Sequence, residues 1–165
     1  MRPNSINYII LLWLAALPLL IGACSVDSSV ALRSYNHIEG SEWNSVDKQS
    51  FVLDTVSTTG DYRLSVGLRA TKEVQLREIY IVVEQQLHNP ALYQKDTLKV
   101  LLTDEQGNMM GKGLALHEYV TPLSRPVHLH KGQSGEITLG HIMRRTQLKG
   151  ITDVGIKIEY EDSGH

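Results

Sequence analysis

A strict alternation of apolar and polar residues is the feature that most constrains how this chain can fold. It is clearest over residues 61–70, where one side of an extended chain carries Tyr62, Leu64, Val66 and Leu68. The other side carries Arg63, Ser65, Gly67 and Arg69. Successive side chains of a β-strand point to opposite faces, so this pattern predicts a strand with one buried face and one solvent face.

Similar segments recur along the chain after residue 50. Strands are predicted at 51–56, 61–70, 78–87, 97–103, 110–119, 127–130, 136–143 and 151–160, the seventh being extended or partly helical. Segment 78–87 is apolar on both faces, and 97–103 is apolar at Leu98, Val100 and Leu102, so both are predicted to be central strands. About eight short strands, with no convincing amphipathic helix after residue 24, favour an all-β antiparallel β-sandwich that is jelly-roll-like. We expect this domain at 50–160 and a loose tail at 161–165.

The N-terminus has the pattern of an export signal. Arg2 supplies a positive charge, and residues 8–21 form an uncharged apolar run of 14 residues, shorter than the roughly 20 that span a membrane. Ile21-Gly22-Ala23-Cys24 then resembles a lipobox, which predicts a signal peptide at 1–23 and a lipid thioether on Cys24. The alternative interpretation is an uncleaved anchor helix with an incidental thiol.

Cleavage before Cys24 leaves 142 of the 165 residues, enough for one domain. Residues 24–49 then form a lipidated tether and a lead-in whose aromatics pack onto the domain. Cys24 is the only cysteine, so the domain has no disulfide. Removing Arg2 changes the net charge from −2 to −3, which gives no case for nucleic-acid binding. Ser25 stands where aspartate signals inner-membrane retention, which favours the outer membrane.

The sequence holds few candidates for chemistry. His128 and His130 share one face of a short strand, but zinc needs a third ligand, available only if the fold brings His117 or His141 near. We interpret the pair as solvated surface histidines. Paired carboxylates, a phosphate-binding glycine loop and a Cys/His cluster are all missing from the sequence. The chain is therefore expected not to be an enzyme, and to use no cofactor and no small-molecule substrate.

Two other motifs are interpreted as turns. Residues 132–136 resemble a nucleophile elbow around Ser134, but Glu136 takes the place of the last glycine. Residues 104–108 are rich in oxygen ligands yet lack the spacing of a calcium loop. Each is better explained as a connection between strands.

Aromatic residues suggest a second class of function. Trp43, Tyr93 and Tyr119 could stack on sugars in a glycan- or peptidoglycan-binding module. Alternatively, Trp43 plugs the bottom of the sandwich.

The C-terminal part carries a resemblance to a known family. Residues 141–144 (HIMR) and 148–159 (LKGITDVGIKIE) resemble the closing signature of the GldH gliding-motility lipoproteins of Bacteroidetes. Upstream segments agree in order, namely Tyr35, Trp43, Asp47 and Phe51, then VGLR at 66–69, then LLTD at 101–104 with Gly107, Gly111 and Gly113. Residues 77–80 and 108–110 depart from the family pattern, where a Tyr/Asn-rich turn and an aromatic are common.

The resemblance covers nearly the whole chain after Cys24. It implies an outer-membrane lipoprotein, anchored through Cys24, that supports the gliding apparatus in a setting linked to type IX secretion. Envelope proteins of that machinery are the implied partners. No catalytic activity follows from the resemblance.

Overall fold

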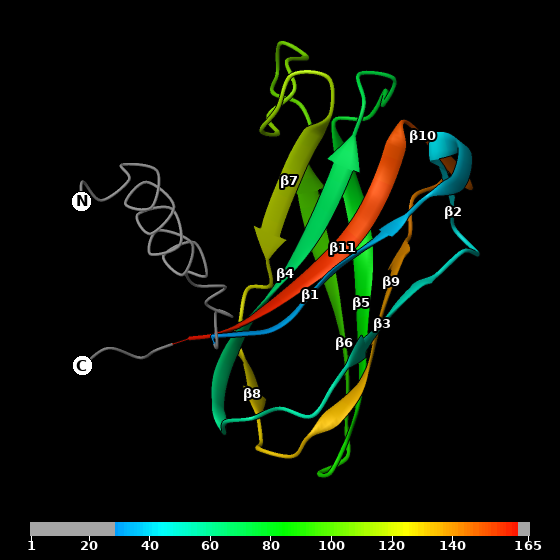
Figure 1. Ribbon diagram of the computed structural model, residues 1–165. Coiled ribbons are helices and arrows are strands. Elements are labelled where there is room, and N and C mark those ends of the chain that lie inside the picture. Colours follow the sequence, from blue (N-terminus) through cyan, green and yellow to red (C-terminus); the bar gives the residue numbers. More distant parts are fainter. Residues whose placement is uncertain (1–28, 162–165) are drawn as a thin grey trace, which may run out of the picture.

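The computed structural model describes residues 29–161, so the predicted signal peptide, Cys24 and residues 162–165 lie outside the described part. The chain there is almost entirely extended (Figure 1). In order it forms β1 (Val30–His37), a 3-10 helix η2 (Glu39–Ser41), β2 (Glu42–Asn44), β3 (Gln49–Leu53), β4 (Gly60–Ala70), β5 (Glu78–His88), β6 (Leu92–Leu101), β7 (His117–Pro122), β8 (Val127–Leu129), β9 (Ser134–His141), β10 (Gln147–Lys149) and β11 (Ile151–Tyr160). Across 29–161, no helix has the length and apolar character needed to cross a membrane.

The strands form two main antiparallel sheets. The first has the order β1-β11-β4-β7, with β8 also paired to β4, and the second has the order β3-β9-β5-β6. A small third sheet pairs β10 with β2. Without the three-residue strands β2, β8 and β10, eight strands remain, and we number these 1 to 8 in chain order. The strand order is then 1-8-3-6 in the first sheet and 2-7-4-5 in the second. This is the strand order of a jelly roll, which confirms the predicted all-β sandwich.

The core lies between the two sheets and follows the alternation seen in the sequence. Tyr62, Leu64, Val66 and Leu68 of β4 are buried, as predicted. From the opposite sheet, Ile79, Ile81 and Val83 of β5 meet them with no exposed surface. β5 lies between β9 and β6, which confirms that 78–87 is a central strand.

The predicted lead-in contributes more than aromatic contacts. β1 pairs with β11 from Val30↔Glu159 to His37↔Asp153 and completes the first sheet. β2 pairs with β10 and places Trp43 in the core with no exposed surface. The sequence missed β1 because most of its residues are partly exposed on both faces, so no clean alternation marks it.

Two predictions about the middle of the chain are wrong. Segment 97–103 is not central, because β6 pairs with β5 alone and forms a sheet edge. Segment 110–119 is a strand only from His117, since the chain at Gly113 has a φ of +130°, which an extended L-residue does not adopt. Residues 102–116 instead fold as a long connection. The region 136–143 is extended, with no helical part.

The sandwich has two distinct ends. At one end the start of β1, the end of β11 and β8 adjoin, through the pairs Val30↔Glu159, Tyr160↔Tyr62 and Tyr62↔Val127. The backbone N–H of Tyr160 donates to Ser29 there, at 2.7 Å. β4 spans the sandwich with 11 residues, about 35 Å. The connections 71–77 and 102–116 lie at its opposite end (Figure 1).

Candidate interaction surface

The structure separates the three predicted stacking residues. Trp43 is fully buried on β2 and its indole N–H donates to the Asp47 carbonyl at 2.9 Å, so it fills the core as the alternative interpretation expected. Tyr119 on β7 is 5% exposed, and its hydroxyl donates to the Leu102 carbonyl. Neither ring has an open face for a sugar, which corrects the stacking interpretation for both. Tyr93 on β6 is exposed.

The histidines are likewise spread over the fold. His128 of β8 and His130, just after it, lie edge to face with ring centroids 5.1 Å apart, and His128 Nδ1 is 2.8 Å from Asp61 Oδ1. His117 and His141 are buried on β7 and β9 and are not brought to this pair. Within residues 29–161, no group of three or more His, Cys, Asp or Glu side chains is placed to hold a metal ion.

The 104–108 segment is a turn, as predicted. Asp104 Oδ1 accepts the backbone N–H groups of Gln106 and Asn108, at 2.9 and 2.8 Å. The Asn108 side-chain amide donates to the other carboxylate oxygen. These bonds lower the pKa of Asp104 below its ordinary value, and they occupy the carboxylate within the turn.

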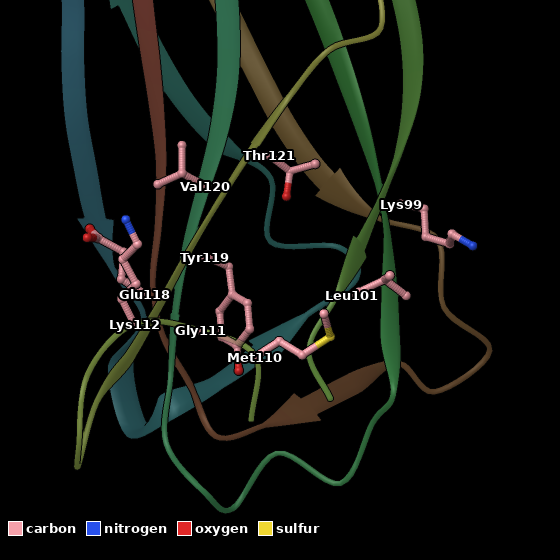
Figure 2. A pocket seen from close by; sticks show the side chains of 9 residues that line it. All are labelled: Lys99, Leu101, Met110, Gly111, Lys112, Glu118, Tyr119, Val120 and Thr121. Atoms are coloured by element: carbon pink, nitrogen blue, oxygen red, sulfur yellow. The ribbon is translucent and has the colours of Figure 1, made fainter. Parts of the chain in front are cut away.

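A groove of about 440 Å³ lies between β6 and β7, the two strands that end their sheets on the same side of the sandwich. We call it the β6–β7 groove (Figure 2). Its lining residues are Lys99, Leu101, Met110, Gly111, Lys112, Glu118, Tyr119, Val120 and Thr121.

A short segment of the chain, residues 110–112, lies at the end of this groove. The Met110 N–H donates to the Leu102 carbonyl at 2.9 Å, next to β6. Lys112 and Glu118 of β7 exchange two backbone hydrogen bonds, of 2.9 and 2.8 Å. Residues 110–112 thus bridge the two sheet edges, and the groove begins where this bridge stops.

Exposed apolar side chains gather in and beside the groove. They are Leu101, Met110, Leu114, Leu116 and Val120, and Leu114 is 91% exposed. Leu101, Met110 and Val120 line the groove itself, and such a group of exposed apolar side chains is less ordinary on a protein surface than single ones.

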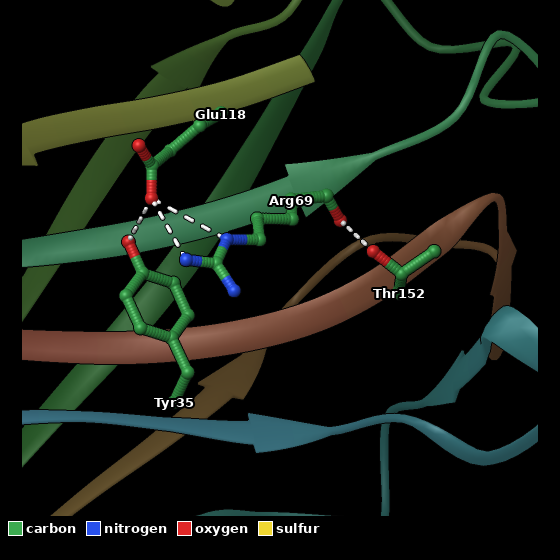
Figure 3. Close-up of polar contacts among 4 residues, drawn as sticks. All are labelled: Tyr35, Arg69, Glu118 and Thr152. Atoms are coloured by element: carbon green, nitrogen blue, oxygen red, sulfur yellow. Dashed lines mark hydrogen bonds and ion pairs between the residues drawn. The ribbon is translucent and has the colours of Figure 1, made fainter. Parts of the chain in front are cut away.

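A cluster of polar and aromatic groups on the outer face of the first sheet borders the groove (Figure 3). The Tyr35 hydroxyl of β1 donates to Glu118 Oε1 at 3.0 Å, and the Arg69 guanidinium donates to the same oxygen at 3.3 and 3.4 Å. Arg69 also lies over the Tyr35 ring, 4.2 Å from its centroid. The cluster joins β1, β4 and β7 across the whole sheet.

Burial, and then the hydrogen bond to the Glu118 carboxylate, raises the pKa of Tyr35 to about 12. The hydroxyl therefore stays a neutral donor at physiological pH. Tyr35 and Arg69 together occupy Glu118, which leaves that carboxylate less able to neutralise the lysines of the groove. Lys112 has no carboxylate within 4.0 Å in the described part of the chain, and Lys99 has Glu78 at 3.7 Å. The rim of the groove is thus slightly positive.

Sequence reasoning missed this cluster, although one signal was present. Gly67 interrupts an otherwise well-formed strand, and a glycine there often marks a close approach of another group. In the structure the Tyr35 ring occupies the space above Gly67 and Gly155. Tyr35, Gly67 and Arg69 all belong to the segments that carry the family resemblance.

Comparison with known proteins supports the resemblance to the GldH family. A family model described as GldH lipoprotein matches residues 30–158, which is most of the chain. The chain belongs to the GldH lipoprotein family. Two relatives are the gliding motility lipoprotein GldH of Flavobacterium johnsoniae, 27% identical over 84% of this chain and 89% of its own, and a GldH homolog of Christiangramia forsetii, 24% identical over 79% and 86%.

Among solved structures, Eiger TNF from S. frugiperda aligns with a TM-score of 0.37 and 11% identity, covering 81% of this chain and 95% of its own. The GldH match runs from the start of β1 to residue 158 in β11 and includes every residue that lines the β6–β7 groove. As a member of a lipoprotein family, the chain is attached to a membrane of the cell envelope.

Proposed function

We propose that this GldH-family chain is an outer-membrane lipoprotein, anchored through Cys24, that serves as a non-catalytic accessory component of the gliding apparatus or of envelope machinery linked to type IX secretion. The observation that carries the proposal is the family match over residues 30–158. It is supported by the names of the two relatives and by the lipobox-like sequence at 21–24, followed by Ser25.

The fold supports a function by contact at a membrane surface. Anchoring at Cys24 leaves residues 25–29 before β1, and five extended residues span at most roughly 17 Å. The end of the sandwich that contains β8 then lies near the membrane. The connections 71–77 and 102–116, at the other end of β4, point away from it and are free to meet a partner.

An envelope glycan as the ligand receives no support from the described aromatics. Of the three residues predicted to stack on sugars, Trp43 and Tyr119 are buried and Tyr93 alone is exposed. The exposed apolar groove between β6 and β7 fits a protein partner better than a sugar, because sugars are bound by open aromatic faces with polar neighbours.

The test is a deletion strain complemented with wild-type protein or with Cys24→Ala, and with Ser25→Ala as the matched control. Wild type and Ser25→Ala should be processed, enter the detergent phase and sediment with outer membranes. Cys24→Ala should keep its precursor size and leave the detergent phase. We expect the deletion to reduce colony spreading or protein secretion, and wild type to restore it.

Recovery of the wild-type protein with inner membranes would contradict the outer-membrane assignment. Normal spreading and normal secretion in the deletion strain would contradict the accessory function. Unchanged processing of Cys24→Ala would contradict the anchor.

A further inference from the structure

The backbone of β7 has unused hydrogen-bonding groups on the side of the groove. Glu118 exchanges both of its backbone bonds with Lys112, so its N–H and carbonyl point away from β4. The Leu123 N–H, five residues on, instead donates to Leu64 of β4. Backbone groups alternate in direction along a strand, so the N–H and carbonyl of Val120 point into the groove, where no described residue pairs with them.

The facing edge of β6 is open in the same way. The Tyr80 carbonyl of β5 accepts the Ile142 N–H beyond the end of β9, so the neighbours Ile79 and Ile81 direct their backbone groups toward β6. They pair with Val100 and Leu98, which leaves the backbone groups of Lys99 and Leu101 directed outward. Two open strand edges therefore face each other across one groove.

The chain itself already enters the space between these edges, with a bend at Gly111. Residues 110–112 bond to Leu102 on one side and to Glu118 on the other. The β6–β7 groove continues past Val120, and no described part of the chain fills it there. Its volume of about 440 Å³ is in the range of peptide and small-ligand sites.

The side chains that line the β6–β7 groove indicate what kind of segment fits there. Met110 and the edge of the Tyr119 ring offer an apolar floor (Figure 2). Lys99 and Lys112 lie at the rim, and the nearby Glu118 is engaged by Tyr35 and Arg69. Lysines at a strand edge discourage pairing with neutral or basic strands, and they favour a strand that carries carboxylates.

We propose that the β6–β7 groove binds an extended segment of a partner protein, with alternating apolar and acidic side chains, that pairs with β7 at Val120, next to residues 110–112. The segment adds a strand to the free sheet edge. The inference rests on the proposed function only for where the partner is found, which is the cell envelope.

The test uses the purified full chain and two labelled ten-residue probes, one alternating valine and glutamate and one alternating valine and lysine. Val120→Pro removes the groove-facing N–H while leaving the bonds to β4, because the neighbouring residues make those. The double variant Lys99→Glu, Lys112→Glu reverses the charge of the rim. The matched control is Lys72→Glu with Lys131→Glu, two exposed lysines outside the groove.

The wild type and the control should bind the glutamate probe saturably and at least about tenfold more tightly than the lysine probe. Val120→Pro should weaken binding by about tenfold, and the Lys99→Glu, Lys112→Glu variant should reverse the preference. The Val120 amide should exchange its hydrogen more slowly when the probe is bound. Thermal unfolding shows whether each variant is folded.

Equal binding of the two probes would overturn the proposal, as would unsaturable binding of the glutamate probe to wild type. Binding unaffected by the charge reversal, with Val120 exchange unchanged, would also overturn it. None of these outcomes depends on anchoring or motility, so failure here is distinguishable from failure of the proposed function.

Discussion

Tyr35 and Glu118 are 83 positions apart in the chain and lie on the opposite edge strands β1 and β7, yet the Tyr35 hydroxyl donates to Glu118 Oε1 at 3.0 Å. β11 and β4 lie between them. Gly155 and Gly67 on those two strands leave the sheet surface bare, so the Tyr35 ring crosses it in contact with both. One side chain thus couples the two edges of the first sheet.

Filling the space under the Tyr35 ring should destabilise the domain. A Cβ at Gly67 meets the Tyr35 hydroxyl and ring, so Gly67→Ala should displace the ring and lower the free energy of unfolding by about 1–3 kcal/mol. Gly140→Ala is the control, because a Cβ at that position has Lys48 Cγ at 3.5 Å, an ordinary contact. Denaturant unfolding measures both. In a Tyr35→Ala background the difference between them should disappear, and its persistence would show that the ring is not the cause.

The raised pKa of Tyr35 should make the domain sensitive to high pH. Below pH 10 the hydroxyl is neutral in both the folded and the unfolded state. Between pH 10 and about 12 the unfolded chain ionises first, so folding loses stability as the pH rises through this window. The free energy of unfolding of wild type minus that of Tyr35→Phe should fall from pH 9.5 to pH 12. A difference in the free energy of unfolding that stays constant over this pH range would contradict the raised pKa of Tyr35.

Acid should destabilise the fold through His141. Its ring is buried beside Trp43, with ring centroids 5.1 Å apart, and burial lowers its pKa below the ordinary value of 6.5. The unfolded chain takes up this proton first as the pH falls, so stability is full above pH 6.5 and declines below it. Unfolding of His141→Gln should depend less on pH between 7 and 5. The exposed His88→Gln should keep the dependence of the wild type.

Three buried polar side chains in the described structure, Gln85, His117 and His141, each have an atom without a hydrogen-bond partner. Gln85 of β5 is 1% exposed, and its Nε2 has no hydrogen-bond partner in the described structure. Gln85→Met keeps the volume and removes the unpaired donor, so the free energy of unfolding should rise by about 1 kcal/mol. Gln86→Met, on the exposed face of the same strand, should change it little. A loss of stability in Gln85→Met would indicate that the amide has a partner.

The sequence predicted the strands of the sandwich well where burial of one face makes every second residue apolar. In β4 and β11 one residue in two faces the opposite sheet, so the apolar pattern and the strand coincide. β1 lacked this pattern because it lies at a sheet edge with both faces partly open. β6 was predicted as central for a related reason, since Leu98 and Val100 are as apolar as residues of a central strand.

The candidate site was beyond sequence reasoning for topological reasons. Lys99 and Val120 share a groove because the jelly-roll order brings β6 and β7 to the same side, and nothing local in either strand indicates this. The Tyr35–Glu118 bond likewise spans four strands of one sheet. From the sequence, Gly67 was interpreted only as a residue of the solvent face of its strand, and Trp43 was left between two interpretations.

The antiparallel pairing of β1 with β11 also has a mechanical consequence. The chain enters the domain at Val30, at one end of the sandwich, and the β6–β7 groove faces the side of β7 toward the other end. A pull applied at Val30 and opposed at β7 acts along the strand axes, whereas the ladder hydrogen bonds run perpendicular to them. The bonds of the β1–β11 ladder then bear tension together, in shear, instead of opening singly from one end as a zipper would.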